Sequence, residues 1–376
     1  MSLATVKPNA DIVRQFKDVR VLVVGDLLVD EFVVGVISRV SREAPVLILK
    51  HRTTSTLPGG AGNVARNLAA LGANVILAGV AGTDQTSDLM VDCLNTEGIA
   101  IEAIVRIYGF VNVKKTRICA EMNHGFTQQV ARVDSETDYE FDSRSINELV
   151  LRARKCIGAC DAILISDYGY GAAAPQLVWR ILDGHHGKLP VILDSRYRLL
   201  SFAGMGITAA TPSEAEVEKA LALDFNGDIE LANREATKLL ETMKLQSIVV
   251  TRGRDGMLVI DKKGNRADIP AFGNCQAVDV TGAGDTVIAA FTAALATGAN
   301  PITAANLANH AAAIAVSKRG TAIVTLQELL AVVDRPSSNS PLDSASHYSI
   351  PVESPPSPLT VRGTQGHTLA KVADPR

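Results

Sequence analysis

The residues best suited to catalysis lie in segment 279–286, DVTGAGDT, which precedes an apolar helical pattern. Gly282 and Gly284 let the backbone turn tightly and present N–H groups at a helix start, where the helix dipole also favours an anion. We therefore predict a phosphate or oxyanion cradle over Gly282, Ala283 and Gly284. Asp285 stands at the same turn, and a carboxylate beside a phosphate site is electrostatically costly unless it acts, for example by taking a proton from an attacking hydroxyl. The alternative is that Asp285 only caps the helix.

A second cluster of polar residues combines two carboxylates after the first predicted strand with the start of the first long helix. Gly59 and Gly60 open a helix that carries Asn63 in its first turns, and Asp26 and Asp30 follow the strand that ends at residue 24. Small residues permit close approach, and Asn and Asp side chains can each bind vicinal hydroxyls. The pattern predicts a polyol site at these five positions. The alternative is a tight helix start with Asn63 as its cap.

A third candidate site is the loop 251–256, TRGRDG, at the carboxyl end of a predicted strand. Such a loop can bring backbone N–H groups and an Arg toward a nucleotide. We therefore assign Thr251, Arg252, Gly253 and Gly256 to nucleotide binding, although the loop alone could be an ordinary hairpin approach. The sequence has neither a GxxxxGK[ST] P-loop nor a strand-first GxGxxG, so phosphate binding must use the turn at 282–285.

The elements that position these residues alternate along the chain. Short apolar runs alternate with amphipathic segments, which is typical of βα units around a mostly parallel sheet. Buried strands are predicted at 21–24, 75–78, 162–166, 191–194 and 247–251. Helices are predicted at 60–71, 85–95, 143–156, 175–182, 213–222 and 231–243. We therefore expect an α/β fold with a doubly wound, mostly parallel central sheet and helices on both faces.

Two stretches interrupt this alternation, at 32–56 and 106–133. Both are rich in Val, Ile and Thr, alternate partly with period two and lack a helical stripe. They predict a small β-sheet that stands as a lid over the carboxyl ends of the main strands, where open α/β sheets bind ligands. The alternative is a decorative edge sheet.

Composition limits the partners of the chain. With 47% hydrophobic residues, 20% charged residues and a net charge of −3, nothing favours nucleic acid or an anionic membrane, so we expect a small-molecule ligand. Five scattered cysteines without a CxxC pair predict neither disulfides nor a zinc module. The N-terminus lacks a signal-peptide pattern, and we expect a cytoplasmic protein. We divide the chain into an N-terminal extension at 1–18, a catalytic domain at 19–334 and a disordered Pro/Ser-rich tail at 335–376.

Together, these motifs resemble those of the ribokinase-like (PfkB-type) carbohydrate kinases over residues 19–333. The N-terminal signature of that family resembles segment 59–72, and its C-terminal signature resembles 279–286. The resemblance implies transfer of the ATP γ-phosphoryl group to a sugar hydroxyl. In that reaction Asp285 would be the catalytic base, and the amides of residues 282–284 would form the anion hole.

Within the family, the chain is most similar to the heptose-7-phosphate kinases of lipopolysaccharide precursor synthesis. The similarity rests on segments 24–30, 38–46 and 166–171. Three residues depart from that pattern. Tyr170 and Arg196 stand where these kinases usually have Lys, and Ser213 replaces the Asn of their Asn-x-x-Glu motif.

The resemblance also implies ligands and further site residues. Mg²⁺-ATP is the expected nucleotide, with a monovalent cation as a further option, and Glu216 would help to order the water shell of the Mg²⁺. Ser213, Thr281 and Asn309 are assigned to the nucleotide site. Charge for an acceptor phosphate could come from Lys115, Arg117, Arg196 and Arg198.

A homodimer through the lid is also expected, because the lid segments carry many apolar residues. The sequence leaves two rival functions open. One is a kinase for another acceptor, such as a hexose, pentose or nucleoside, and the other is a non-catalytic sugar-binding regulator.

Overall fold

The computed structural model of the chain describes residues 10–121, 127–136, 139–185, 187, 189–273 and 277–334. The predicted tail at 335–376 and the first nine residues of the predicted extension lie outside this part. Residues 10–18 form the helix α1 (Ala10–Arg14) and the 3-10 helix η1 (Gln15–Asp18). Val13 and Phe16 are fully buried, so this segment packs as part of the core.

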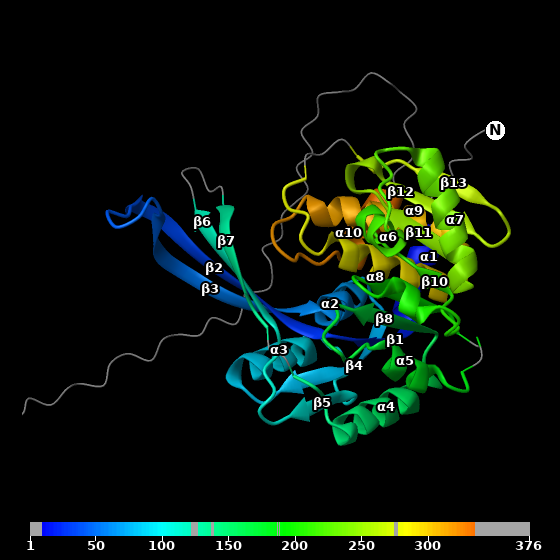
Figure 1. Ribbon diagram of the computed structural model, residues 1–376, viewed down its shortest axis with the longest axis horizontal. Helices are drawn as coiled ribbons and strands as arrows, with labels where there is room; N and C mark the ends of the chain where they lie inside the picture. The colour runs from blue at the N-terminus through cyan, green and yellow to red at the C-terminus, as the bar shows by residue number, and fades with distance from the viewer. Residues whose placement is uncertain are drawn as a thin grey trace, which may run out of the picture.

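The main sheet confirms the predicted α/β fold (Figure 1). Its nine strands run parallel except around β12, which is antiparallel to both of its neighbours. In spatial order they are β13 (Arg266–Ile269), β12 (Met257–Asp261), β11 (Ser247–Thr251), β10 (Ala209–Ala210), β9 (Val191–Ser195), β8 (Ala162–Asp167), β1 (Arg20–Gly25), β4 (Asn74–Gly82) and β5 (Ile104–Ile107). All five predicted strands are among them.

Each face of the main sheet has its own hydrophobic core, because side chains alternate across a strand. In β1, Val21 and Val23 face one core, and Leu22 and Val24 face the other. The first core is covered by α1, α2 (Ala61–Ala70), α3 (Gln85–Thr96), α8 (Ala283–Ala296), α9 (Pro301–Val316) and α10 (Leu326–Val333). The second is covered by α4 (Ser143–Ile157), α5 (Pro175–Leu182), α6 (Glu214–Leu221) and α7 (Ile229–Met243). Within the described residues, every helix is too short or too polar to cross a membrane.

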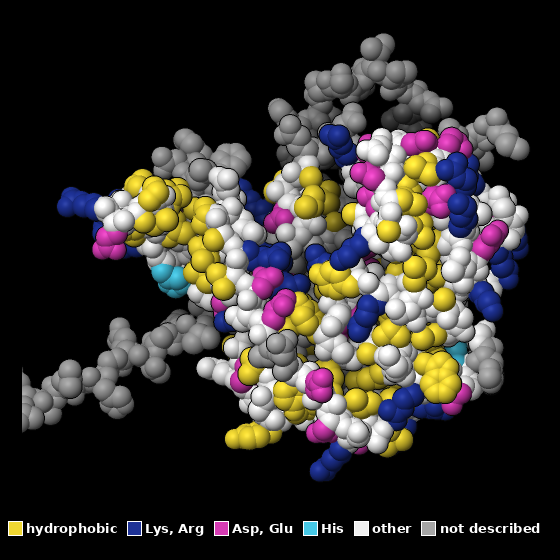
Figure 2. All heavy atoms as spheres, viewed as in Figure 1, with side chains coloured by type: hydrophobic (Ala, Val, Ile, Leu, Met, Phe, Trp, Pro, Cys, Tyr) yellow, Lys and Arg dark blue, Asp and Glu magenta, His cyan; other side chains and the backbone are white. Residues whose placement is uncertain are grey.

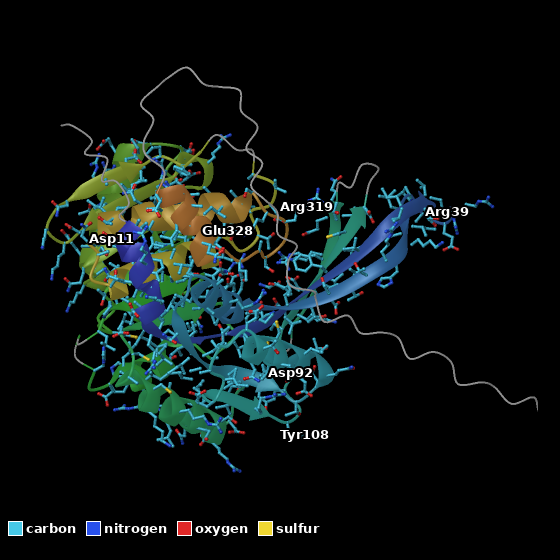
Figure 3. All side chains as sticks on the ribbon, turned by 180° about the vertical axis from the view of Figure 1, so that it is seen from behind. Asp11, Arg39, Asp92, Tyr108, Arg319 and Glu328 are labelled. Carbon is cyan, nitrogen blue, oxygen red and sulfur yellow. The ribbon has the colours of Figure 1, made fainter. Side chains whose placement is uncertain are left out.

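A separate four-stranded sheet extends away from this core (Figure 1). In spatial order it contains β3 (Leu47–Gly60), β2 (Leu27–Val40), β6 (Lys114–Glu121) and β7 (Thr127–Ser135). Seen from behind, Arg39 marks its outer end (Figure 3). The strands overlap the segments predicted at 32–56 and 106–133 with different limits. β2 already begins two residues after β1 ends, and Arg106 belongs to β5 of the main sheet.

Hydrophobic side chains gather on the visible face of this small sheet (Figure 2). The exposed large ones include Val40, Val46, Leu47, Val130 and Val133. An apolar surface of this kind on a four-stranded sheet is typical of a protein contact.

Candidate active site

Three elements that are distant in the sequence meet at Asp285. This residue lies in the first turn of α8 and is only 6% exposed. Asn63, in the first turn of α2, donates from Nδ2 to Oδ2 of Asp285 at 2.6 Å. Tyr168, directly after β8, donates its hydroxyl to Oδ1 at 2.7 Å. The Asp285 carboxylate is therefore oriented by one donor on each oxygen.

The surroundings of Asp285 adjust its basicity. Burial raises the pKa of Asp285 from 3.8 to about 6, and the hydrogen bonds from Asn63 and Tyr168 counteract the rise. The Asp30 carboxylate raises this pKa further, and the Lys115 ammonium lowers it. A carboxylate with a pKa of about 6 is mostly ionised at neutral pH and can accept a proton in a transition state. Asp285 thus has the properties of a general base.

The turn before α8 is built without a side-chain cap. Gly282 is the N-cap residue, with φ at +79°, and a Cβ there would lie 2.9 Å from Nδ2 of Asn63. The N–H of Ala283 donates to the carbonyl of Val280 at 3.2 Å. By contrast, the amides of Gly282 and Gly284 have no backbone partner among the described residues. A Cβ on Gly284 would meet nothing within 4 Å, so the predicted cradle offers two amides beside open space.

The side chain of Asp279 fixes the shape of this turn. Its Oδ1 accepts the N–H of Thr281 at 2.9 Å, and its Oδ2 accepts the N–H of Gly320 at 2.9 Å. The amide of Thr281 therefore points into the turn.

Asn63 is positioned by its own network. Its carbonyl accepts a hydrogen bond from Nδ2 of Asn67 at 3.0 Å, and Oδ1 of Asn67 accepts one from the Thr286 hydroxyl at 3.0 Å. Oδ1 of Asn63 is buried and has no hydrogen-bond partner in the described part of the chain. It can accept a hydrogen bond from a bound hydroxyl, which supports the predicted polyol site.

Asp26 contacts the loop after β8. Its carboxylate accepts the N–H groups of Tyr168, Tyr170 and Ala172 at 2.9, 3.0 and 2.8 Å. The side chain is 2% exposed, and its pKa is raised chiefly by burial. Predicted from the sequence as a sugar ligand, Asp26 is engaged here with protein amides, and it fixes the loop that carries Tyr168.

Asp30 lies where the small sheet meets the core. Its carboxylate forms an ion pair with Arg117 of β6, and both side chains are at least nine-tenths buried. A Cβ on Gly59 would lie 2.5 Å from Oδ2 of Asp30, so only glycine fits there. Gly60 has φ at +58°, and a Cβ there would lie 2.6 Å from the carbonyl of Asp26. The two glycines therefore make room for the chain and for the Asp30 carboxylate.

The four cations predicted for an acceptor phosphate fall into two groups. Arg117 is paired with Asp30, and Arg198 is paired with the buried Asp167. In the described part of the chain, no ion pair involves Lys115 or Arg196. These two flank the Tyr168 ring, with Nζ of Lys115 5.3 Å and Cζ of Arg196 5.9 Å from its centroid. Burial, followed by the charge of Arg196, lowers the pKa of Lys115, and the carboxylates of Asp30 and Asp134 partly oppose this.

Most of the residues predicted for the nucleotide are held by protein contacts. Ser213 and Glu216 close a capping box at the start of α6, and Ser213 bridges to Thr251 in parallel register. Arg252 lies 3.6 Å from Glu214 and 3.5 Å from Asp268, and its buried Nε has no hydrogen-bond partner within the described residues.

The remaining nucleotide candidates also have structural roles. Gly253 opens the 3-10 helix η3 (Gly253–Asp255), and Gly256 follows it with φ at +87°. A Cβ on Gly256 would lie 2.0 Å from the carbonyl of Ile269. Asn309, on α9, donates from Nδ2 to the carbonyl of Pro270 at 2.8 Å.

The sequence did not predict Asp194, which lies near the end of β9. Burial raises its pKa well above the ordinary value, and the carboxylates of Glu216 and Asp285 raise it further. In the described part of the chain, no group of three His, Cys, Asp or Glu side chains could hold a metal by itself. Asp194 and Glu216 suit Mg²⁺, which usually takes one or two carboxylates together with substrate phosphates. The position of Asp194 at the carboxyl end of a predicted strand was the available signal.

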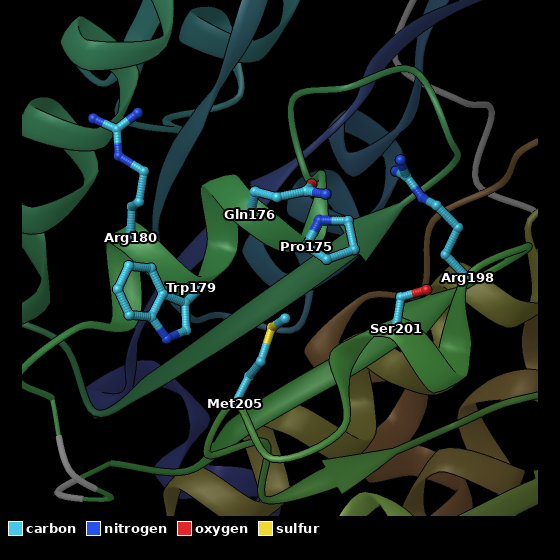
Figure 4. A pocket seen from close by; sticks show the side chains of 7 residues that line it. All are labelled: Pro175, Gln176, Trp179, Arg180, Arg198, Ser201 and Met205. Carbon is cyan, nitrogen blue, oxygen red and sulfur yellow. The ribbon is translucent and has the colours of Figure 1, made fainter.

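A surface hollow of about 560 Å³ lies apart from these residues (Figure 4). Trp179 of α5 and Met205 face each other across it, and Arg198 and Ser201 line another side (Figure 4). Asp285, Asn63 and Tyr168 do not line it. The candidate active site is therefore defined by converging polar groups and not by this hollow.

Comparison with known proteins agrees with this geometry. The model of the pfkB family carbohydrate kinases matches residues 21–328. The chain belongs to this family. The curated relatives include the bifunctional protein HldE of Desulfatibacillum aliphaticivorans, 37% identical over 84% of this chain and 63% of its own length. HldE of Mesorhizobium japonicum is 36% identical over 86% of this chain and 64% of its own length. This pfkB family member thus spans less than two thirds of these relatives.

Solved structures share the fold of this pfkB family member. Ribokinase of Arabidopsis thaliana, complexed with ribose and ATP, aligns with a TM-score of 0.65 at 18% identity, over 85% of this chain and 99% of its own. Phosphofructokinase-2 of Escherichia coli, in complex with fructose-6-phosphate, aligns with a TM-score of 0.67 at 17% identity, over 84% of this chain and 100% of its own. The ribokinase-like architecture predicted from the sequence is thereby confirmed.

Proposed function

We propose that the chain transfers the γ-phosphoryl group of ATP to a hydroxyl of a sugar phosphate, with a heptose-7-phosphate-like acceptor. The observation that carries this proposal is the arrangement at Asp285. A buried carboxylate with a pKa of about 6, held by Asn63 and Tyr168, stands beside an uncapped helix start with free amides. A base next to an anion cradle is what transfer of a phosphoryl group to a hydroxyl requires.

In the proposed reaction, Asp285 takes the proton of the acceptor hydroxyl while that oxygen attacks the γ-phosphorus in line. The bond between the γ-phosphorus and its bridging oxygen breaks, and ADP leaves with the electron pair. The amides of Gly282 and Gly284 stabilise charge on the phosphoryl oxygens. Asp194 and Glu216 would hold Mg²⁺, which neutralises phosphate charge when bound. Oδ1 of Asn63 accepts a hydrogen bond from the acceptor, and closure of the small sheet excludes water.

Lys115 and Arg196 support a phosphorylated acceptor. An acceptor phosphate carries nearly two negative charges and needs cations that are not already paired. Among the four candidates, Arg117 and Arg198 already have carboxylate partners, which leaves Lys115 and Arg196. Both cations lie beside the Tyr168 ring, and an anion that binds both of them would relieve the repulsion between them.

The direct test is an ATP-consumption screen over sugars and their phosphates, with Arg196→Ala and, as the control, Arg144→Ala at an exposed position of α4. We expect turnover on a phosphorylated sugar. Arg196→Ala should raise the Michaelis constant for that sugar by about tenfold or more, the loss of roughly one charge-assisted hydrogen bond, with little change for ATP.

The two rival functions predict other results in this screen. Equal kinetics on a sugar and its phosphate, in wild type and variant alike, would favour a neutral hexose, pentose or nucleoside acceptor. Sugar binding without ATP consumption would favour a non-catalytic regulator. Varying K⁺ in the same assay tests whether a monovalent cation is used.

Association through the small sheet is a further part of the proposal. Its exposed valines and Leu47 support a homodimer in which two small sheets cover each other's apolar faces. Light scattering at micromolar concentration should give twice the chain mass, and a monomer mass would contradict this. We place the reaction in the cytoplasm, where ATP is supplied.

A further inference from the structure

The structure assigns Tyr168 as the positioning residue of the general base. We infer that its hydroxyl fixes the orientation of the Asp285 carboxylate and keeps that group ionised during turnover. This inference rests on the proposed function, because it presumes that Asp285 acts as a base. The observation that carries it is the partly buried hydrogen bond from the Tyr168 hydroxyl to Oδ1 of Asp285, 2.7 Å long, between residues 117 positions apart.

Two donors are needed to fix a carboxylate. With Asn63 alone on Oδ2, the Asp285 group could still rotate about the bond to its Cβ. The second bond, from Tyr168 to Oδ1, removes that freedom. Each carboxylate oxygen accepts more than one hydrogen bond, so a lone pair remains for the proton of the acceptor.

The loop that carries Tyr168 is held from several sides. The Asp26 carboxylate accepts the amide of Tyr168 itself at 2.9 Å. Asp167 accepts the N–H of Gly169 at 3.1 Å and is paired with Arg198. The buried carboxylates of Asp26 and Asp167 thus hold one short loop, and this loop holds the Tyr168 hydroxyl against Asp285.

The aromatic ring of Tyr168 has a separate role from its hydroxyl. Nζ of Lys115 and Cζ of Arg196 lie 5.3 and 5.9 Å from the ring centroid, so the ring lies beside both cations proposed to bind the acceptor phosphate. Replacing Tyr168 by Phe keeps the ring and removes only the hydrogen bond to Asp285. The two roles can therefore be separated by substitution.

The charges around Asp285 fix the direction of the expected effect. The titratable groups that face it are Tyr168, Asp30 of β2, Lys115 of β6 and Asp194 of β9. Burial and Asp285 itself raise the pKa of Tyr168, so Tyr168 stays protonated and donates throughout the working range. Loss of the hydroxyl removes a bond that favours the ionised carboxylate, so the pKa of Asp285 must rise.

The test compares the pH profiles of kcat/KM for wild type, Tyr168→Phe and Tyr170→Phe. Tyr170→Phe is the matched control, because its hydroxyl also donates to a carboxylate at 2.7 Å, that of the exposed Glu136. The wild-type acid limb should fall near pH 6, where Asp285 titrates. Tyr168→Phe should move it upward by about one pH unit or more and lower kcat/KM at about pH 6.5 by roughly threefold or more.

Three further results are expected. The loss in Tyr168→Phe should become much smaller at high pH, where Asp285 is ionised in both forms. The Michaelis constant for the acceptor should stay within about threefold, because the aromatic ring beside the two cations remains. Tyr170→Phe should keep the wild-type profile. An unchanged acid limb in Tyr168→Phe would reduce Tyr168 to a packing role.

A second variant keeps the inference testable if Tyr168→Phe does not fold. Fluorinated tyrosine at position 168 keeps the shape of the side chain and makes the hydroxyl a stronger donor. It should therefore move the acid limb downward, and no shift would overturn the inference. Failure of the proposed function is distinguishable, because the wild-type protein would then transfer no phosphoryl group to any sugar, whereas failure of this inference alone leaves wild-type turnover intact.

Discussion

The starts of helices α6 and α8 differ in how their amides are satisfied. At α6, Ser213 accepts the N–H of Glu216 at 3.3 Å, and Glu216 accepts the N–H of Ser213 at 2.8 Å. At α8, the N-cap is Gly282, and no side chain caps the helix. Both turns are predicted from the sequence to serve the nucleotide, but only the α8 start leaves amides for a ligand.

This difference shows how two helix starts with the same dipole can have different uses. A capping box supplies its own acceptors, so a phosphate has little to gain at that helix start. A glycine cap in a left-handed conformation supplies none, and it needs an anion or water to satisfy its donors. The comparison therefore favours the α8 turn over the α6 start as an anion site.

The largest effect is expected at Asp285, the proposed general base in the first turn of α8. Asp285→Asn keeps the size of the side chain but cannot accept the proton, so turnover should fall by about two to four orders of magnitude. Steady-state kinetics measure this, with the melting temperature and ATP binding as controls for folding. If the variant keeps more than a tenth of wild-type turnover, Asp285 is only part of the helix start. The difference between the α6 and α8 starts would then say nothing about catalysis.

A smaller effect is expected from adding one methyl group to the same turn. In Gly282→Ala the new Cβ would lie 2.9 Å from Nδ2 of Asn63, so it should displace a partner of Asp285 and lower kcat by roughly tenfold to a hundredfold. The matched control is Gly298→Ala, which has φ at +87° and no neighbour within 4 Å. Both variants should lose about 1 kcal/mol of unfolding free energy. Equal activity in the two would show that the space beside Gly282 is not used.

The smallest effects are expected at the start of α6. Two variants there distinguish the capping role of Ser213 from the charge of Glu216. Ser213→Ala should cost about 1 kcal/mol of stability and leave the Mg²⁺ dependence of turnover unchanged. Glu216→Gln keeps an acceptor for the N–H of Ser213, so the melting temperature should not change. The Mg²⁺ concentration that gives the half-maximal rate should rise by up to about tenfold. An unchanged Mg²⁺ dependence in Glu216→Gln would leave this residue a purely structural role.

The fold and the two signature turns were predictable because their signals are local. Apolar periodicity indicated five of the nine strands of the main sheet within a few residues, and the glycines of segments 59–62 and 282–284 marked the turns. The strands β5, β10, β12 and β13 were not predicted. Asp285 and Asn63 were identified separately, and the structure joins them by a bond across 222 residues.

The pairing of charged groups was not predictable. Asp26 could bind a sugar or a loop, and only the three-dimensional placement of residues 168–172 shows that it accepts three of their amides. Four cations looked equivalent in the sequence, and the partners Asp30 and Asp167 separate them into paired and unpaired ones. Such distinctions depend on contacts between distant strand ends, for which one sequence carries no signal.

The hairpin of β2 and β3 has a consequence for how the family can diversify. It leaves the core after Asp26 and returns at Ala61, where the N–H of Ala61 donates to the carbonyl of Asp26 at 3.0 Å and Leu27 pairs with Gly60. Its two ends thus meet at one point, as in a domain insertion. A hairpin from another kinase could be grafted there, exchanging Asp30, the partner of Arg117, while Asp285 and its turn stay in place. The outer sheet and the turn at Asp285 can in this way evolve as separate modules of one chain.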